Sequence, residues 1–128
     1  MIYADLLGIP YELGGRDSAR SLDCWGLCVE VCRRAGIELP DFQSPGSFED
    51  VAGVMERARP EFVKIPGPEP YCIVAFCLRG KWVNHAGVVM EDGRSFIHCL
   101  RGRNVAVERL DHLLWSKVAA GFYKWAGK

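Results

Sequence analysis

Apolar residues recur at helical spacing in one segment near the start of the chain. The stripe repeats at offsets 0, 3, 4, 7 and 8, and its members are Cys24, Leu27, Cys28, Val31 and Cys32. Ser21 or Asp23 can cap the start of such a helix, and Gly36, which follows two arginines, can end it. The pattern predicts an amphipathic helix over residues 23–35.

The rest of the first half gives weaker signals. Residues 2–7 predict a short helix, and the glycine- and serine-rich residues 14–18 predict a loop. A serine followed three residues later by an aspartate resembles a capping box and predicts a second helix over residues 47–57. The prolines between residues 60 and 70 indicate an irregular stretch.

The second half changes to short apolar runs that are divided by turn sequences. Dividers such as Glu91-Asp92-Gly93 and Arg101-Gly102 are typical of hairpins. The runs, each long enough for one strand, cover residues 71–78, 82–90, 94–100, 104–109 and 119–125. Helices followed by a strand meander predict an α+β fold, with the N-terminal helices packed on a C-terminal antiparallel sheet of about five strands.

The chain is short and electrically balanced. Its 128 residues suffice for one domain, which we place at residues 1–128. Sixteen basic residues against sixteen acidic ones give no net charge that would favour nucleic acid or an anionic membrane. No apolar run approaches the roughly 20 residues of a membrane span. The start of the chain also lacks the basic region of a signal peptide, so we expect a protein that is cytoplasmic at synthesis.

Six cysteines are present, and one of them stands in a special position. No two form a CxxC pair, and their spacing matches neither a zinc knuckle nor the disulfide framework of a small secreted domain. Most are therefore expected to be reduced, buried and apolar in character. Cys24 falls in the first turn of the predicted helix, where unpaired N–H groups and the helix dipole stabilise a thiolate. Position alone ranks Cys24 first as a candidate nucleophile.

A cysteine nucleophile also needs a base and a group that orients the base. His85 and His98 lie in two neighbouring predicted strands on either side of the turn at residues 91–93, so antiparallel pairing brings them near each other. Whether they share a face depends on the register, which the sequence leaves open. His112 lies in a polar break and has no comparable setting.

Two other interpretations of these residues stay open. A cysteine in a helical stripe is more often a core residue than a nucleophile, and a histidine in a strand is more often structural than catalytic. The same side chains are also candidate metal ligands, although their spacing is unlike the known structural zinc patterns.

Four short motifs, in this order, resemble those of the NlpC-type papain-like cysteine peptidases, a family of cell-wall endopeptidases. That family has Y-x-x-G-G, D-C-x-G-[LFV], H-x-G-[IV] and a strand that ends in F-I-H. The corresponding segments are Tyr11-Glu12-Leu13-Gly14-Gly15, Leu22-Asp23-Cys24-Trp25-Gly26-Leu27, His85-Ala86-Gly87-Val88-Val89-Met90 and Phe96-Ile97-His98-Cys99. The likeness extends from about residue 10 to residue 125, which is most of the chain.

The resemblance implies a papain-like fold and a role for each matching residue. Cys24 is then the nucleophile, His85 the general base and acid, and His98 the group that orients His85. Tyr11 matches a loop tyrosine that helps to form the site and the oxyanion hole. Asp23 matches an acid that caps the helix and supports the loop.

Two further residues are judged against this scheme. Gly26 is expected to let the helix pack closely against the sheet. Asn84 is tempting as a third catalytic residue, but its place next to His85 on a strand turns it to the opposite face. The resemblance implies no metal and no organic cofactor.

Other features narrow or depart from the family pattern. Trp25 directly after the nucleophile, and the ending at residues 121–125, resemble the members attached to phage tails. The family usually has P-G-D before its first core strand, where this chain has Glu69-Pro70-Tyr71-Cys72 and lacks the aspartate that fixes the loop.

Together these features predict a cysteine endopeptidase, a peptidoglycan hydrolase that cuts stem peptides between D-glutamate, through its γ-carboxyl, and a diamino acid. The expected partners are the stem peptide and other phage tail proteins, and the expected site of action is the cell wall, reached by way of a virion. The alternatives are an amidase or acyltransferase on the same fold, and a catalytically silent structural tail protein.

Overall fold

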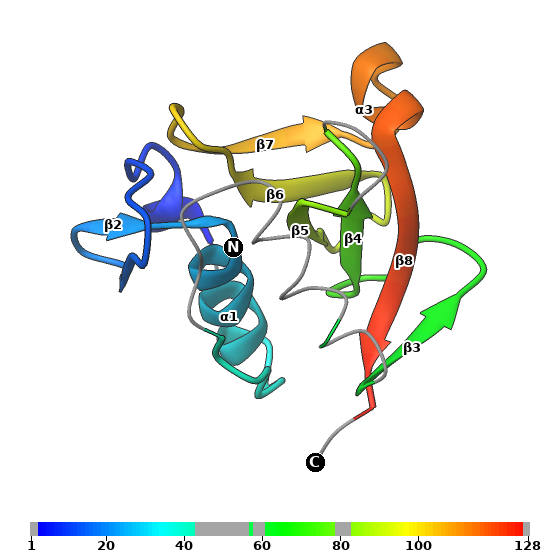
Figure 1. The fold of residues 1–128 in the computed structure, drawn as a ribbon, viewed down its shortest axis with the longest axis horizontal. Helices are drawn as coiled ribbons and strands as arrows, with labels where there is room; N and C mark the ends of the chain where they lie inside the picture. Colours follow the sequence, from blue (N-terminus) through cyan, green and yellow to red (C-terminus); the bar gives the residue numbers. More distant parts are fainter. Residues whose placement is uncertain (1–2, 43–56, 58–60, 79–82, 127–128) are drawn as a thin grey trace.

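The computed structural model describes residues 3–42, 57, 61–78 and 83–126 of the chain. Helices and strands follow one another along it as Figure 1 shows. The elements are the 3-10 helix η1 (Ala4–Leu6), β1 (Arg16–Asp17), β2 (Ser21–Leu22), α1 (Cys24–Arg34), β3 (Phe62–Ile65), β4 (Ile73–Phe76), β5 (His85–Val89), β6 (Ser95–Cys99), β7 (Val105–Arg109), α3 (Leu113–Val118) and β8 (Ala119–Trp125).

Six of the strands form one antiparallel sheet in the order β3-β8-β4-β5-β6-β7. The strands β4 to β7 are a meander, and β8 returns to pair with β4 on one side and β3 on the other. The predicted α+β architecture is confirmed. The sheet has six strands rather than about five because Phe62–Ile65, flanked by prolines in the sequence, pairs with the last strand.

The main predicted helix is confirmed with its cap. The Asp23 carboxylate accepts a hydrogen bond of 2.7 Å from the backbone N–H of Gly26, and α1 begins at Cys24. Gly36 ends the helix region with a φ of +85°, a conformation that glycine adopts without strain. At the start of the chain, the expected short helix is a single 3-10 turn. The helix predicted at residues 47–57 lies outside the described residues, apart from Arg57.

Two elements differ from the sequence prediction. Residues 14–18, expected to form a loop, contain β1, which pairs with β2 in a small separate hairpin. The helix α3 was not predicted, since the polar residues at its start indicated a break. His112 caps it, because its Nδ1 accepts a hydrogen bond of 3.2 Å from the N–H of Leu114.

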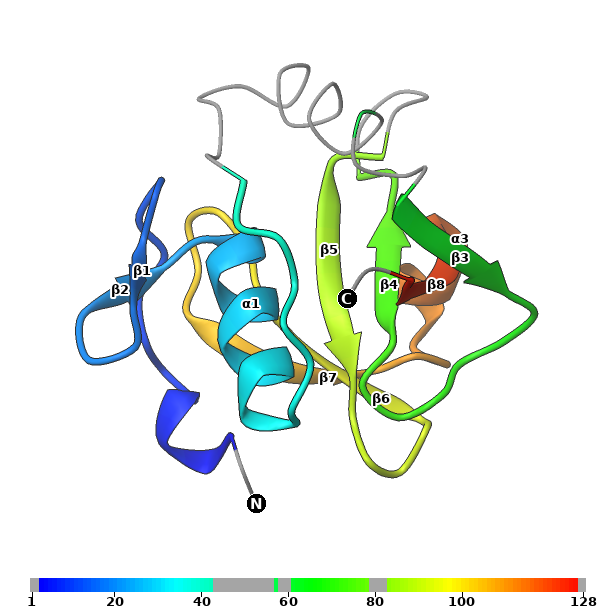
Figure 2. The same cartoon turned by 90° about the horizontal axis from the view of Figure 1, so that it is seen from below.

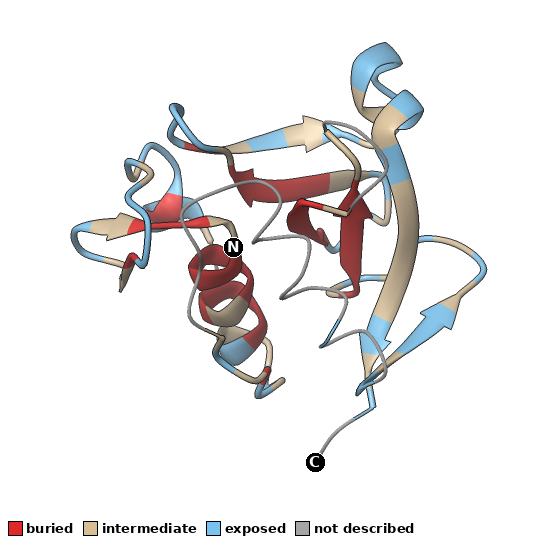
Figure 3. Cartoon of the chain, in the orientation of Figure 1, coloured by how far each residue is buried: buried red, intermediate tan, exposed pale blue. Residues whose placement is uncertain are grey.

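Side chains on the two faces of the sheet form two separate apolar clusters. On one face α1 packs along β5 and β6, and α1 and β5 begin at the same end of the molecule (Figure 2). This helix-side cluster contains Leu27, Val31, Ala86, Val88, Ile97 and Cys99. The cluster on the opposite face contains Phe76, Val89 and Phe96, with Trp115 from α3 against it. Figure 3 shows that burial is concentrated in α1 and the central strands.

The turn before β4 has an unusual backbone. Tyr71 has a φ of +65°, the left-handed region that glycine favours, at the position where the family motif has glycine. Its N–H donates to the Val89 carbonyl at 2.8 Å, and the N–H of Cys72 donates to the Glu69 carbonyl at 3.1 Å. Backbone hydrogen bonds therefore hold this turn without the missing aspartate.

Among the helices in the described part of the chain, none is long and apolar enough to cross a membrane.

Candidate active site

Cys24 is the first residue of α1 and lies against the sheet. Part of the residue remains accessible, but its sulfur is surrounded by protein, near the backbone N–H groups of Ala86 on β5 and of Trp25. Cys99 on β6 is close enough for the charge of Cys24 to help raise the pKa of the Cys99 thiol. The candidate nucleophile is thus held at the strand that begins with His85.

A buried carboxylate fixes the loop before the helix. Asp23 is fully buried, and besides the N–H of Gly26 it accepts hydrogen bonds from the N–H of Gly14 at 2.8 Å and from the Arg16 guanidinium at 2.7 Å. The role expected for Asp23, capping and loop support, matches these three contacts.

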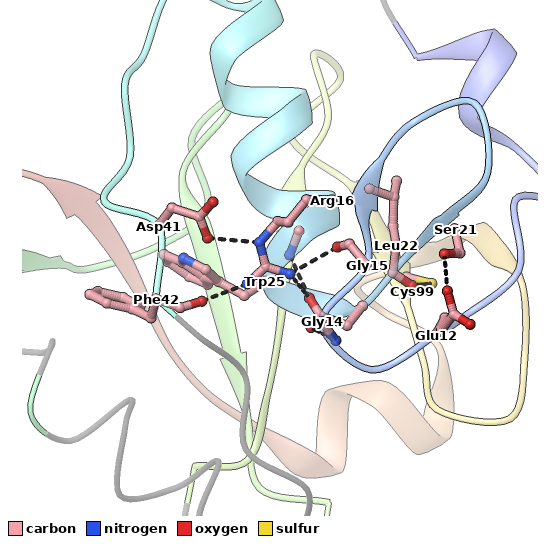
Figure 4. Close-up of polar contacts among 12 residues, drawn as sticks. Glu12, Gly14, Gly15, Arg16, Ser21, Leu22, Trp25, Asp41, Phe42 and Cys99 are labelled. Carbon is pink, nitrogen blue, oxygen red and sulfur yellow. Dashed lines mark hydrogen bonds and ion pairs between the residues drawn. The ribbon is translucent and has the colours of Figure 1, made fainter.

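Arg16 ties this loop to the segment that follows α1. Its guanidinium also binds the Gly15 carbonyl at 2.8 Å, the Asp41 carboxylate at 2.7 Å and the Phe42 carbonyl at 2.5 Å (Figure 4). Trp25 secures the same segment, since its ring stacks on Phe42 with centroids 5.2 Å apart. Trp25 therefore holds the segment that follows α1 beside Cys24, the candidate nucleophile.

Gly26 has a different role from the one expected. A Cβ at this position would collide with the carbonyl oxygen of Gly15 and would lie 3.0 Å from Arg16 Nη1. Gly26 therefore permits close approach of the loop at Gly15 and Arg16 to the helix, and the atoms nearest to such a Cβ belong to this loop and to Asp23. A Cβ on Gly15 would in turn lie 2.7 Å from the Ser21 carbonyl oxygen, so both glycines are required by close packing.

Tyr11 lies near Cys24, the candidate nucleophile. Its backbone bridges Leu22, the residue before Asp23, and the N–H of Tyr11 donates to the Arg103 carbonyl at 3.2 Å. Burial raises the pKa of the Tyr11 hydroxyl, and the nearby Cys24 adds to this effect. The guanidinium of Arg101 lies 5.9 Å above the Tyr11 ring.

His85 and His98 are in direct contact. Nε2 of His85 lies 2.9 Å from Nδ1 of His98. The ladder between β5 and β6 pairs Val88 with Ile97, and continuing it by one step places Gly87 opposite His98. His85, two residues earlier, shares that face and lies diagonal to His98. The register that the sequence left open therefore puts both rings on one side of the sheet.

Gly87 makes room for this pair. A Cβ on it would lie 2.8 Å from the Ile97 carbonyl oxygen and 3.2 Å from the Cβ of His98. The glycine in the H-x-G motif thus has a physical reason, because a side chain would push β6 and His98 away.

The two histidines belong to the face opposite α1. Their rings lie against Phe76, Phe96 and Trp115, with centroid distances from 4.7 Å between His98 and Trp115 to 6.3 Å between His85 and Trp115. Cys24 approaches the same strand at Ala86, whose side chain faces the helix. Among the described residues the structure joins His85 to His98 by a hydrogen bond, and Cys24 to the backbone of β5.

Burial controls the charge of both rings. Burial lowers the pKa of His85 well below 6.5, and the neighbouring His98 lowers it further. Burial also lowers the pKa of His98, while the Glu108 carboxylate opposes that shift. At neutral pH both imidazoles are therefore neutral.

Burial also overturns the expectation that Cys24 has a depressed pKa. Burial, with a contribution from the Asp23 carboxylate, raises the pKa of the Cys24 thiol to about 12. The N–H groups of Ala86 and Trp25 and the charge of Arg16 act in the opposite direction but are outweighed. The sequence argument was right that backbone N–H groups lower the pKa of Cys24, but it omitted burial, which raises that pKa by more. The resting pair is thiol and neutral imidazole.

Other residues of the site were not identified from the sequence. Glu108 on β7 has its Oε2 3.5 Å from Nε2 of His98, and Trp115 covers both rings. Arg101 lies at Tyr11. The alternation of β7 was visible in the sequence, but only the register with β6 shows which of its side chains reaches His98. Asn84 is turned elsewhere, since its Oδ1 accepts from the N–H of Leu78 at 2.8 Å.

Comparisons with known proteins agree with the fold. Similar solved structures include an NLP/P60 family protein similar to a lipoprotein from Staphylococcus aureus subsp. aureus Mu50, with a TM-score of 0.67 and 22% identity over 99% of this chain and 40% of that chain. An NlpC/P60 family protein from Bacillus cereus ATCC 10987 has a TM-score of 0.69 and 20% identity, over 95% of this chain and 37% of that chain. The NlpC/p60 domain of the peptidoglycan hydrolase SagA has a TM-score of 0.58 and 17% identity, over 95% of this chain and 93% of that chain.

These TM-scores show a shared fold. This chain spans about two fifths of the length of the first two proteins. No curated protein matches it. The sequence model of the NlpC/P60 family matches residues 8–124 and so includes every candidate site residue named above. This chain therefore belongs to the NlpC/P60 family.

Proposed function

We propose that this protein is a cysteine endopeptidase that hydrolyses the stem peptide of peptidoglycan, at the bond between the γ-carboxyl of D-glutamate and a diamino acid. The observation that supports it best is the placement of Cys24 against β5, the strand that begins with His85, whose ring contacts His98 on β6. Family membership and the structural likeness to the hydrolase SagA support the same substrate class.

The reaction that this site favours starts from neutral groups. Because the Cys24 thiol has a raised pKa and the His85 imidazole a lowered one, the proposed first step is transfer of the thiol proton to His85 as the sulfur attacks the carbonyl carbon. This step requires the His85 ring, at the first residue of β5, to turn from the Phe76 side of the sheet toward the Cys24 sulfur. The N–H of Cys24 and the Tyr11 hydroxyl stabilise the oxyanion. The imidazolium then protonates the leaving amine, and water, activated by His85, hydrolyses the thioester.

Digestion of purified sacculi tests the proposal. We expect wild-type protein to release stem fragments that mass spectrometry assigns to cleavage next to D-glutamate, with no loss of activity in a chelator. Cys24→Ser should abolish release, because a hydroxyl is a poor nucleophile at this site. Cys28→Ser is the matched control: it lies one turn deeper in the helix-side cluster and should lose stability, by about 1 kcal/mol, while the folded protein stays active.

The same experiment separates the alternatives. Acyl transfer without free fragments would identify an acyltransferase of the same fold. Cys24 that resists iodoacetamide in an inactive wild-type protein would favour a silent structural role. Activity that a chelator removes would replace the cysteine mechanism by a metal-dependent one.

We also propose that the protein reaches the cell wall as part of a phage tail, together with other tail proteins. The support is the resemblance of Trp25 and of residues 121–125 to tail-associated members. Mass spectrometry of purified virions from the source strain tests this, and absence of the protein from tails would refute it.

A further inference from the structure

Behind the two histidines, the site continues to a third strand. The register of β6 and β7 pairs Phe96 with Glu108 and His98 with Ala106, so the side chains of His98 and Glu108 share a face and lie diagonal to each other. Oε2 of Glu108 is 3.5 Å from Nε2 of His98, whose other nitrogen contacts His85 at 2.9 Å. His98 is buried, and the Glu108 side chain is 30% exposed.

We propose that Glu108 is a positioning residue that fixes the tautomers of His98 and His85, so that the unprotonated nitrogen of His85 is the one left for the Cys24 proton. This inference rests on the proposed function in assigning the proton to Cys24. The tautomers themselves are a property of the resting protein.

The argument follows from the donors and acceptors along the chain of contacts. A carboxylate only accepts hydrogen bonds, so it favours the His98 tautomer with its proton on Nε2. Nδ1 of that ring is then an acceptor, and Nε2 of His85 must be the donor at 2.9 Å. His85 is neutral, so its Nδ1 carries no proton and can act as the base.

Without Glu108 the order of donors can reverse. A proton on Nδ1 of His98 would be donated to Nε2 of His85, and the His85 proton would then sit on Nδ1. That ring could not take a proton from the thiol. The protein would then be a mixture of two tautomeric states with similar energies. Only the state in which Nδ1 of His85 is unprotonated can accept the thiol proton.

The charges around His98 act in different directions. From β5, His85 repels a proton on His98 when it is itself charged. From β7, Glu108 raises the pKa of His98, and from the turn before β7 the charge of Arg103 lowers it. Phe96 and Trp115 supply apolar contact only. Loss of the Glu108 charge should therefore make the imidazole pair harder to protonate.

Imidazole 15N chemical shifts test the proposal on the resting protein, without substrate. We expect both His85 and His98 to carry their proton on Nε2 in the wild type and in Glu108→Gln, whose amide oxygen still accepts. Glu108→Ala should give averaged shifts, which indicate mixed tautomers. Glu69→Gln is the matched control. It removes the same charge from a glutamate whose ion-pair partner is Lys124, at 2.6 Å, and should leave the histidine shifts unchanged.

Kinetics on a stem peptide give a second readout. Glu108→Ala should lower kcat by about 10- to 100-fold with little change in KM, because the proposed role of Glu108 acts through His98. In Glu108→Gln the acid limb of kcat/KM, expected below pH 6.5 in the wild type, should move to lower pH by about one unit.

Wild-type tautomers in Glu108→Ala, or an acid limb that does not move in Glu108→Gln, would overturn the proposal. An inactive wild-type protein with the expected tautomers would instead overturn the proposed function and leave the role of Glu108 in the histidine pair standing. If Glu108→Ala fails to fold, the shift of the acid limb in Glu108→Gln and the 15N spectra of that variant decide the matter.

Discussion

Asp23 stabilises the loop around Cys24 and at the same time opposes ionisation of that thiol. Its carboxylate is fully buried and binds two backbone N–H groups and Arg16. The same negative charge helps to raise the pKa of the adjacent Cys24. The residue therefore favours a resting thiol that reacts only when a base removes its proton, which suits the proposed cysteine peptidase because such a thiol resists unselective alkylation and oxidation.

Asp23→Asn should separate these two effects. We expect the pKa of Cys24 to fall, so that labelling by iodoacetamide becomes faster at a given pH, while the free energy of unfolding drops by about 1–3 kcal/mol. Asp41→Asn is the control, because Asp41 shares the partner Arg16 at 2.7 Å but is largely exposed. It should leave the labelling profile unchanged and cost less than about 1 kcal/mol. Equal labelling profiles for the two variants would contradict this account of Cys24.

Gly87→Ala tests whether the histidine pair depends on close strand contact. The new Cβ would lie 2.8 Å from the Ile97 carbonyl oxygen, so β6 must shift, at a cost of about 1–3 kcal/mol, and His98 must shift with it. We expect a large loss of kcat. Gly67→Ala adds a Cβ into open space and should change neither stability nor activity. Urea unfolding and turnover measured on both variants provide the comparison, and a fully active Gly87→Ala enzyme would show that the pair tolerates separation.

At the scale of elements, predictions from the sequence succeeded where one periodic pattern and one cap agree. The helix α1 combines a regular apolar stripe with Asp23 at its start and Gly36 at its end. The strands β4 to β8 have apolar runs between turn residues. By contrast, β3 is short, half-exposed and flanked by prolines, and it is a strand only because β8 offers a free edge. Tertiary pairing, which no local pattern contains, decided that element.

The candidate site, too, was predictable where local patterns decide and unpredictable where tertiary contacts decide. The sequence ranked Cys24 by its place in a helix turn, and two strands with a turn between them brought the histidines together. It could not supply the register that puts His85, His98 and Glu108 on one face, nor the burial that reverses the expected pKa of Cys24. Both depend on contacts between residues far apart in the chain.

The helix α3 supports the site although it has only six residues. Trp115 covers His85 and His98, so Trp115→Ala should lower the free energy of unfolding by about 2–4 kcal/mol and admit water to both rings. Their pKa values should then rise toward 6.5, which moves the acid limb of kcat/KM to higher pH. Leu114→Ala, at a residue that is 67% exposed, is the control and should have little effect. An acid limb that stays in place in Trp115→Ala would show that α3 does not shield the histidines.

The whole molecule should be most stable in a window near neutral pH, because it buries neutral histidines and neutral thiols. A histidine whose pKa is lowered by folding destabilises the fold as pH falls below 6.5, since the unfolded chain binds the proton more readily. A thiol whose pKa is raised has the opposite effect: the unfolded chain releases the proton first as pH rises through about 9. Such raised values are found for Cys24, Cys28, Cys32, Cys72 and Cys99.

Urea unfolding at a series of pH values tests this expectation. The free energy of unfolding should fall on both sides of the window, and on the alkaline side each buried thiol adds a slope of up to about 1.4 kcal/mol per pH unit. Cys28→Ala should reduce the alkaline slope by the contribution of one thiol. A free energy of unfolding that is constant between pH 9 and pH 11 would mean that the thiols ionise as easily in the folded protein as in the unfolded chain.

The position of β8 has a consequence for how the molecule is made. This strand follows the other five strands of the sheet in the chain, yet it lies inside the sheet between β3 and β4. While the chain is being synthesised, β3 has no neighbour and β4 presents an open edge, so a nascent chain that already contains Cys24, His85 and His98 still lacks a closed sheet to hold them. The sheet can therefore close only after β8 has been synthesised, and a chain that stalls before residue 119 is left with exposed strand edges that invite aggregation.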